Sequence, residues 1–166
     1  EKGATLEEML AESGIDHGKF QQNNAYLCAD QFLQLARNFV RRFPEAGCGL
    51  EFGRRLNITT RGTVGLAVLS MSTLGEAIRF TVKYQEVLEI PQVASIETHD
   101  DGVHILFRFD EAVIQDAALL RFLVESNLAS YINTGRYLLH AHFDPVAVYF
   151  PYATPAQSDA YQTLFG

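Results

Sequence analysis

The hydrophobic period of this sequence changes at Pro91, and this change constrains the fold more than any other feature. Up to that point, apolar residues recur at helical spacing. Residues 93–111 instead alternate, and one face carries Val103, Ile105, Phe107 and Phe109. Asp101-Gly102 is a hairpin turn signal. Because helical spacing then returns, the order predicts an antiparallel hairpin between helices, an α+β fold, and disfavours an alternating parallel sheet.

The rest of the chain predicts mostly helix. Expected helices cover residues 6–13, 30–43, 47–56, 60–70, 73–90 and 112–139, with a last helix from Pro155. Thr5 and Asp30 are the expected N-caps of the first two helices. Residues 146–150 predict a third strand. The expected architecture is a helix-rich single domain, residues 1–166, whose small antiparallel sheet (the hairpin plus this returning strand) packs against the long helix.

Several glycines lie inside these predicted helices. Gly62 and Gly65 would let another backbone approach the apolar helix at 60–70, which is expected to be buried. Thr73 and Glu76 form a capping box around Gly75. A glycine inside a helix costs roughly 1 kcal/mol relative to alanine. We therefore expect tight packing at Gly75, with an anion at this helix N-terminus as the alternative.

Composition narrows the class of protein. The chain has 166 residues, is 48% hydrophobic and carries a net charge of −7, which disfavours a nucleic-acid surface. No apolar run is long enough to span a membrane, and the N-terminus lacks signal-peptide order. Cys28 and Cys48 are expected to be free thiols in a cytoplasmic protein, with a disulfide between them as the alternative.

Glu125 interrupts the apolar face of the predicted long helix. A carboxylate among Phe122, Ala129 and Ile132 needs a partner. A salt bridge to Arg61 or Arg136 is one interpretation, and a polar anchor in a ligand pocket is the second. Catalysis as an acid is the third, although no nucleophile motif, P-loop or dinucleotide motif accompanies it.

Aromatic residues are abundant, with 12 Phe and 7 Tyr. An apolar pocket with few polar anchors uses this inventory, as does a filled core. We place the candidate pocket between the hairpin and the long helix, lined by Glu125, Phe122, Tyr84, Phe107, Phe109 and Tyr149. His140 and His142 form an H-x-H pair without an evident third ligand, so neither a metal nor a cofactor is predicted.

Motifs distributed over almost the whole chain share their order with a known family. They are MLAESGID (9–16), GLEFGRRL (49–56), RGTVGLAVLSMSTLGEAI (61–78), LLRFLVESNLA (119–129) and PVAVYFPYATPAQSDAYQTLFG (145–166). Together they resemble the N-terminal, arabinose-binding-like effector domain of AraC/XylS-type bacterial transcription regulators. Leu66-Ala67 departs from the pattern, since members often carry an aromatic there.

This resemblance implies a domain that binds a small effector or mediates dimerisation. DNA would be bound only through a C-terminal helix-turn-helix half, which residues 1–166 lack. The aromatic inventory favours an amphipathic effector such as a fatty or aromatic acid. The alternatives are a dimerisation module without a small-molecule ligand, and a small enzyme that uses Glu125 with a histidine.

Overall fold

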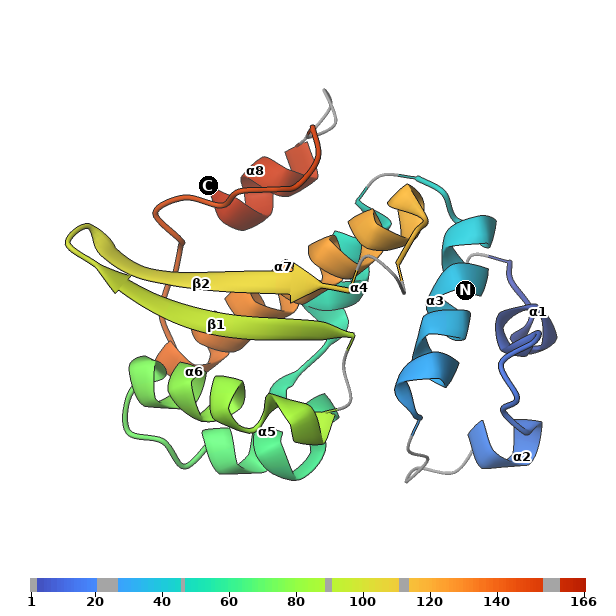
Figure 1. Ribbon diagram of the computed structural model, residues 1–166, viewed down its shortest axis with the longest axis horizontal. Helices are drawn as coiled ribbons and strands as arrows, with labels where there is room; N and C mark the ends of the chain where they lie inside the picture. Colours follow the sequence, from blue (N-terminus) through green and yellow to red (C-terminus); the bar gives the residue numbers. More distant parts are fainter. Residues whose placement is uncertain (1–2, 21–26, 46, 89–90, 111–113, 154–158) are drawn as a thin grey trace.

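The computed structural model describes residues 3–20, 27–45, 47–88, 91–110, 114–153 and 159–166. Its elements, coloured along the chain in Figure 1, confirm the α+β class. They are α1 (Leu6–Leu10), α2 (His17–Phe20), α3 (Ala29–Arg42), α4 (Cys48–Arg55), the 3-10 helix η1 (Ile58–Arg61), α5 (Gly62–Val68), α6 (Leu74–Lys83), the 3-10 helix η2 (Gln85–Leu88), β1 (Gln92–His99), β2 (Gly102–Phe109), α7 (Ala117–Leu139) and α8 (Asp159–Phe165).

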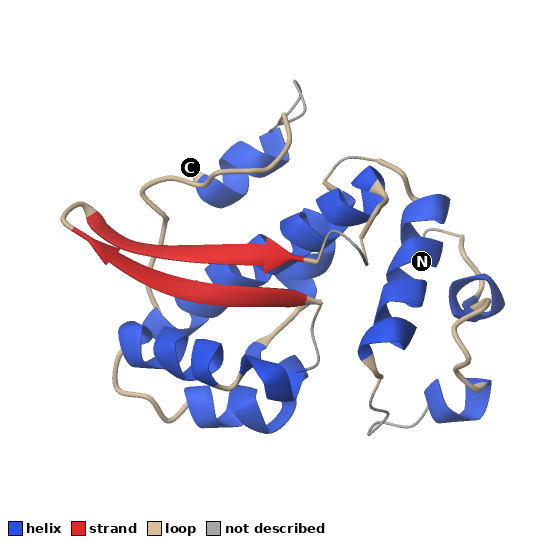
Figure 2. Cartoon of the chain, in the orientation of Figure 1, coloured by secondary structure: helices blue, strands red, loops and turns tan. Residues whose placement is uncertain are grey.

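The hairpin forms as the alternating pattern predicts. β1 and β2 pair antiparallel, from Gln92 opposite Phe109 to His99 opposite Gly102. Gly102 has a φ of 146° at the turn, a conformation that favours glycine. The apolar face packs on helices: Ala94 is buried, and the Phe107 ring lies 4.9 Å from that of Tyr131 on α7. Figure 2 shows the hairpin tip extending beyond the helices.

The prediction of a third strand at residues 146–150 is wrong. Within the described residues the sheet contains β1 and β2 only, and residues 146–150 are irregular. Val146 and Tyr149 are exposed, whereas the Phe150 ring packs 5.2 Å from Tyr161 and 5.6 Å from Phe165. The segment therefore contacts α8 through one side chain, Phe150, which packs on two aromatic rings, and it pairs with neither β1 nor β2.

α7 is the central helix. It begins at Ala117, five residues later than the predicted position 112, because the Asp116 side chain caps it by accepting the backbone N–H of Ala118 at 2.8 Å; residues 112 and 113 lie outside the described part. In Figure 1, α7 lies behind the hairpin, with α5 and α6 on one side and α8 on the other.

Buried apolar side chains form clusters along α7. One joins α3 to the start of α7 through Leu33, Leu119 and Phe122, with Phe109 packed against it. A second joins α4, α7 and α8 through Leu50, Ala129, Ile132, Tyr161 and Leu164. A third, Ile58, Val68 and Ala77, holds α5 and α6 together.

The structure confirms one of the expected helix caps and corrects two. Thr5 caps α1 as predicted, and Glu8 completes that capping box. α3 is capped at Cys28, because the Gln31 side chain accepts the Cys28 N–H at 3.2 Å, which places Asp30 inside the first turn. Thr73 caps α6, but Glu76 reaches the N–H of Ser72. α6 then ends at Lys83, before position 90.

The glycines behave differently from one another. A Cβ at Gly65 would lie 1.9 Å from the Ile58 carbonyl oxygen, which confirms the close approach predicted there. Gly62 has open space and a φ of 56°, so its backbone conformation requires glycine. At Gly75 a Cβ would meet only the end of the Arg79 side chain at 3.5 Å, so the predicted tight packing is wrong. The segment 60–70 is not fully buried either, since Leu66 and Leu69 are exposed.

Candidate functional site

Glu125 is the most buried charged side chain of the described residues, at 1% exposure. Its Oε1 accepts hydrogen bonds from the Gly47 N–H at 3.3 Å and from the Tyr161 hydroxyl, and its Oε2 accepts from the Gly49 N–H at 3.1 Å. These four residues form the Glu125 network. It joins α7 to the start of α4 and to α8.

The salt bridge predicted for Glu125 is wrong. Arg61 donates to the Ser130 hydroxyl at 3.3 Å and lies over the Tyr131 ring. Arg136 donates to Phe143, Asp144 and Leu164 instead. The buried charge is stabilised instead by backbone and hydroxyl donors and by the positive end of the α4 helix dipole.

The glycine-rich stretch GCGLEFG supplies the two backbone N–H groups that bind the Glu125 carboxylate. Gly47 is the N-cap of α4 with a φ of 86°, in the left-handed region. A Cβ at Gly49 would lie 2.8 Å from Glu125 Oε2, and a Cβ at Gly53 would lie 2.2 Å from the Ser126 carbonyl oxygen. The stretch is therefore a loop and helix start that holds a carboxylate of the same chain, and it lets α4 lie directly against α7.

Three titratable groups near Glu125 have raised pKa values. Burial, reinforced by the Glu125 charge, raises the pKa of the Cys48 thiol to about 11. Burial raises the pKa of Tyr152 to about 12. Burial and the hydrogen bond to Glu125 raise the pKa of Tyr161 well above its usual range. All three groups stay protonated at neutral pH, so Tyr161 remains a donor to the carboxylate.

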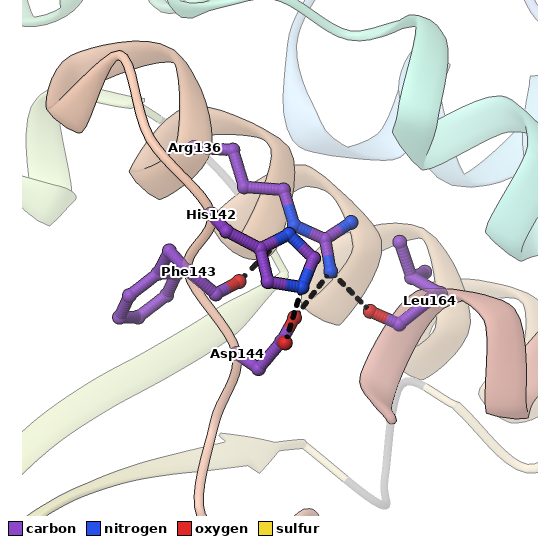
Figure 3. A network of polar contacts seen from close by, with 5 residues as sticks. All are labelled: Arg136, His142, Phe143, Asp144 and Leu164. Carbon is purple, nitrogen blue, oxygen red and sulfur yellow. Dashed lines mark hydrogen bonds and ion pairs between the residues drawn. The ribbon is translucent and has the colours of Figure 1, made fainter.

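Arg136 connects the other end of α8 to α7 (Figure 3). Its guanidinium donates to the Phe143 carbonyl at 3.1 Å, to Asp144 at 2.7 Å and to the Leu164 carbonyl at 2.9 Å. His142 pairs with the second Asp144 oxygen at 2.7 Å. α8 is thus held at two points, by Glu125 through Tyr161 and by Arg136 through Leu164.

Two hollows lie beside the Glu125 network. The larger, the α4–α8 groove, has a volume of about 760 Å³ and is open to solvent; its lining is Glu45, Gly47, Cys48, Leu50, Glu51, Arg54, Arg55 and Ala160. The smaller, the Arg121 hollow, has a volume of about 20 Å³; its lining is Val40, Phe43, Pro44, Glu45, Cys48, Ala118, Arg121, Phe122 and Glu125. Both share Glu45 and Cys48, so they lie next to each other.

The six predicted site residues do not share a cavity among these two. Phe122 and Glu125 line the Arg121 hollow. Phe109 packs on the core cluster that contains Phe122, while Phe107 packs on Tyr131. Tyr84 is 38% exposed beside Phe80, and Tyr149 is 89% exposed. The predicted location between hairpin and long helix is therefore not where the described hollows lie.

The histidines and cysteines in the described part of the chain form neither a metal site nor a disulfide. No group of three or more His, Cys, Asp or Glu side chains there is placed to hold a metal ion. His140 ends α7 with a φ of 48°, and His142 pairs with Asp144. Cys28 and Cys48 are free thiols, so the alternative of a disulfide between them is wrong.

Comparison with known families agrees with this architecture. Residues 3–166 match the family described as the arabinose-binding domain of AraC transcription regulators, N-terminal. The chain belongs to this family. The AraC-type domain is 32% identical over 143 residues to an ornithine utilization regulator of Pseudomonas aeruginosa, covering 86% of this chain and 41% of that protein.

Two further relatives are uncharacterised helix-turn-helix-type transcriptional regulators of Mycobacterium bovis and Mycobacterium tuberculosis. Each is 27% identical over 136 residues, covering 81% of this chain and 38% of the relative. The chain thus spans about two fifths of the length of these relatives. No solved structure matches it. Within the described residues, no helix of the domain has the length and apolar character that crossing a membrane requires.

The sequence prediction missed the residues that complete the site of the AraC-type domain. Tyr161 donates to Glu125 from 36 residues away, and no spacing rule connects them. Gly47 and Gly49 were recognisable as a glycine-rich stretch, but the stretch lacked the pattern of a phosphate loop. Arg121 could have been found, because it lies four residues before Glu125 and shares its helix face.

Proposed function

We propose that this domain is the effector-sensing part of an AraC-type transcription regulator. A small molecule would bind it and control DNA binding by a C-terminal half beyond residues 1–166. Family membership supports this proposal, as do relatives that are transcription regulators more than twice as long as the matched region. Such a protein would work in the bacterial cytoplasm, without catalysis of its own.

The observation that carries the proposal is the position of the α4–α8 groove. Its lining comes from Glu45, from α4 and its N-cap Gly47, and from Ala160 of α8. Behind it, Glu125 binds the N–H groups of Gly47 and Gly49 and the Tyr161 hydroxyl. A ligand in the groove would contact both helices that share this carboxylate. Its binding would therefore favour one arrangement of α8 over others, as a sensor requires.

We propose an amphipathic acid, fatty or aromatic, as the effector class. Leu50 and Ala160 in the groove, the apolar walls of the Arg121 hollow, and Arg54 and Arg121 support this class. Glu45 and Glu51 line the groove as well, and Glu51 pairs with Arg55 at 2.7 Å. Amino acids form the second class to test, because one relative is named for ornithine utilization.

Thermal unfolding against a library of fatty acids, aromatic acids, amino acids and sugars tests the proposal. A ligand at about 100 times its dissociation constant stabilises the native state by about 2.7 kcal/mol. For a domain of this size the expected rise in Tm is roughly 5–11 °C. A flat response across the whole library would contradict a sensor function.

Dimerisation is the second candidate function, and it would be compatible with the first. Since the described sheet contains only β1 and β2, each strand has one edge without a strand partner. Val93 and Val103 are exposed on these strands. Free strand edges are sites where a second chain can pair. Thr98 and Val103 are exposed, and their N–H groups point away from the partner strand. Light scattering after gel filtration should then show a dimer that a proline at either position weakens, whereas a monomer at all concentrations would exclude it.

A further inference from the structure

Arg121 has an unusual environment for a cation on the central helix. It precedes Glu125 by four residues, the spacing at which two side chains share a helix face. The oxygens of Glu125 are nevertheless used by Gly47, Gly49 and Tyr161. Among the described residues, the Arg121 Nε is buried and makes no hydrogen bond. Its guanidinium lies 5.4 Å from the centre of the Tyr152 ring, which holds it in place.

A buried donor that makes no hydrogen bond to the protein costs free energy, and more so when it is charged. Buried side-chain donors in folded proteins almost always have an acceptor. The charge of Glu125 is already compensated by its own donors, while the charge of Arg121 has no carboxylate partner in the described part of the chain. The missing partner is therefore an acceptor, and a negatively charged one fits best.

The hollow beside Arg121 has the shape and lining for such a group. Its volume of about 20 Å³ exceeds the roughly 10–15 Å³ that one water molecule needs, so a small polar group fits and a whole organic molecule does not. Its apolar walls come from Val40, Phe43, Pro44, Ala118 and Phe122, and the side chains of Arg121 and Glu125 complete the lining. The rim residues Glu45 and Cys48 also line the α4–α8 groove, which is large enough for the rest of a ligand.

We propose that Arg121 binds the carboxylate of an acidic ligand with a largely apolar body. The carboxylate would enter the hollow and accept from Nε, while the body would lie on the apolar walls and in the adjoining groove. This inference rests on the proposed sensor function and moves the polar anchor of the pocket from Glu125 to Arg121. Glu125 also lines the hollow, but its oxygens stay bonded to Gly47, Gly49 and Tyr161, so its role is to hold α4 and α8 in place around the ligand.

Calorimetric titration of the protein with benzoate and with hexanoate, each beside its neutral amide, tests the assignment. We expect both acids to bind at neutral pH and the amides to bind more weakly. Arg121→Gln should weaken binding of the acids on the order of 10- to 100-fold, since a charge-assisted hydrogen bond is lost. Arg121→Lys keeps the charge without Nε and should fall between. Arg79→Gln, an exposed arginine on α6, is the matched control and should leave the affinity within about twofold.

Circular dichroism and Tm establish that each variant is folded before titration. Equal affinity of Arg121→Gln and the parent for the acids would overturn the inference, as would amides that bind as tightly as the acids, or no binding of either acid at millimolar concentration. If another class of effector from the thermal library binds independently of Arg121, the inference fails and the sensor function stands. If no compound of either set binds, both fail.

Discussion

At Glu125 a fully buried charge is compensated by hydrogen-bond donors and a helix N-terminus rather than by a cation. Such donors lower the free energy of the ionised carboxylate without requiring a second buried charge. The arrangement also explains why the polar residue in the apolar stripe does not weaken the core. At the scale of the single residue, the role of Glu125 is to join α7 to α4 and α8. A ligand in the α4–α8 groove would affect it through those two helices.

Glu125→Gln should destabilise the domain. The amide would direct an N–H group at one of the donors that now bind the carboxylate, leaving a buried donor unsatisfied at a cost of about 1–3 kcal/mol. The expected fall in Tm is roughly 2–12 °C. Scanning calorimetry measures it, with the exposed Glu97→Gln as the control. An unchanged Tm would mean that the network contributes nothing to stability.

At the scale of elements, the decisive contact is between α4 and α7. Gly49 and Gly53 are one turn apart on α4, and each lies against the α7 backbone or its small side chains. Glycine at these positions permits the approach that places Gly47 and Gly49 within hydrogen-bond distance of Glu125. Helix α6, by contrast, carries Gly75 without such a neighbour.

Two glycine-to-alanine variants should therefore change stability in opposite directions. Gly53→Ala places a Cβ 2.2 Å from the Ser126 carbonyl oxygen, so the helices must separate, with a loss of about 1–3 kcal/mol. Gly75→Ala adds a Cβ that meets only the Arg79 side chain, at an ordinary contact distance of 3.5 Å, and should stabilise the domain by roughly 0.5–1 kcal/mol. Urea unfolding measures both. A destabilised Gly75→Ala would show that this glycine has a role that its surroundings do not reveal.

At the scale of the whole molecule, the groups around Glu125 join four parts of the chain. Cys48 comes from α4, Tyr152 from the segment after α7, Tyr161 from α8 and Glu125 from α7. Burial raises the pKa of Cys48 to about 11 and that of Tyr152 to about 12. Deprotonation of Cys48 or Tyr152 would place a charge in this buried region, and it therefore opposes the packing that holds the C-terminal part of the domain to its core.

The domain should lose stability at alkaline pH. Because folding raises the pKa of Cys48 from 9.0 to about 11, its contribution is complete below pH 9 and declines as the pH rises toward 11. Urea unfolding between pH 8 and pH 11 measures this decline. Cys48→Ala should reduce it, while the exposed Cys28→Ala should not. Identical pH profiles for the two variants would contradict the assignment.

Local signals in the sequence predict the structure correctly where interactions between nearby residues decide the conformation. The alternation after Pro91 and the Asp101-Gly102 turn predicted the hairpin, and Thr5 and Thr73 predicted helix starts. The strand expected at 146–150 does not form, because Phe150 packs on α8 and the segment pairs with neither β1 nor β2. The pocket expected between hairpin and long helix stays a prediction that neither described hollow supports.

By itself, the sequence determined the α+β class, the hairpin and the anomalous position of Glu125, because periodicity and turn chemistry act over a few residues. Only the tertiary structure decided what Glu125 binds, since its donors lie 76, 78 and 36 residues away. It also distinguished Gly53, where a Cβ would clash with α7, from Gly75, where a Cβ has room. The physical reason is that burial and close approach depend on which elements meet, and no local pattern encodes that choice.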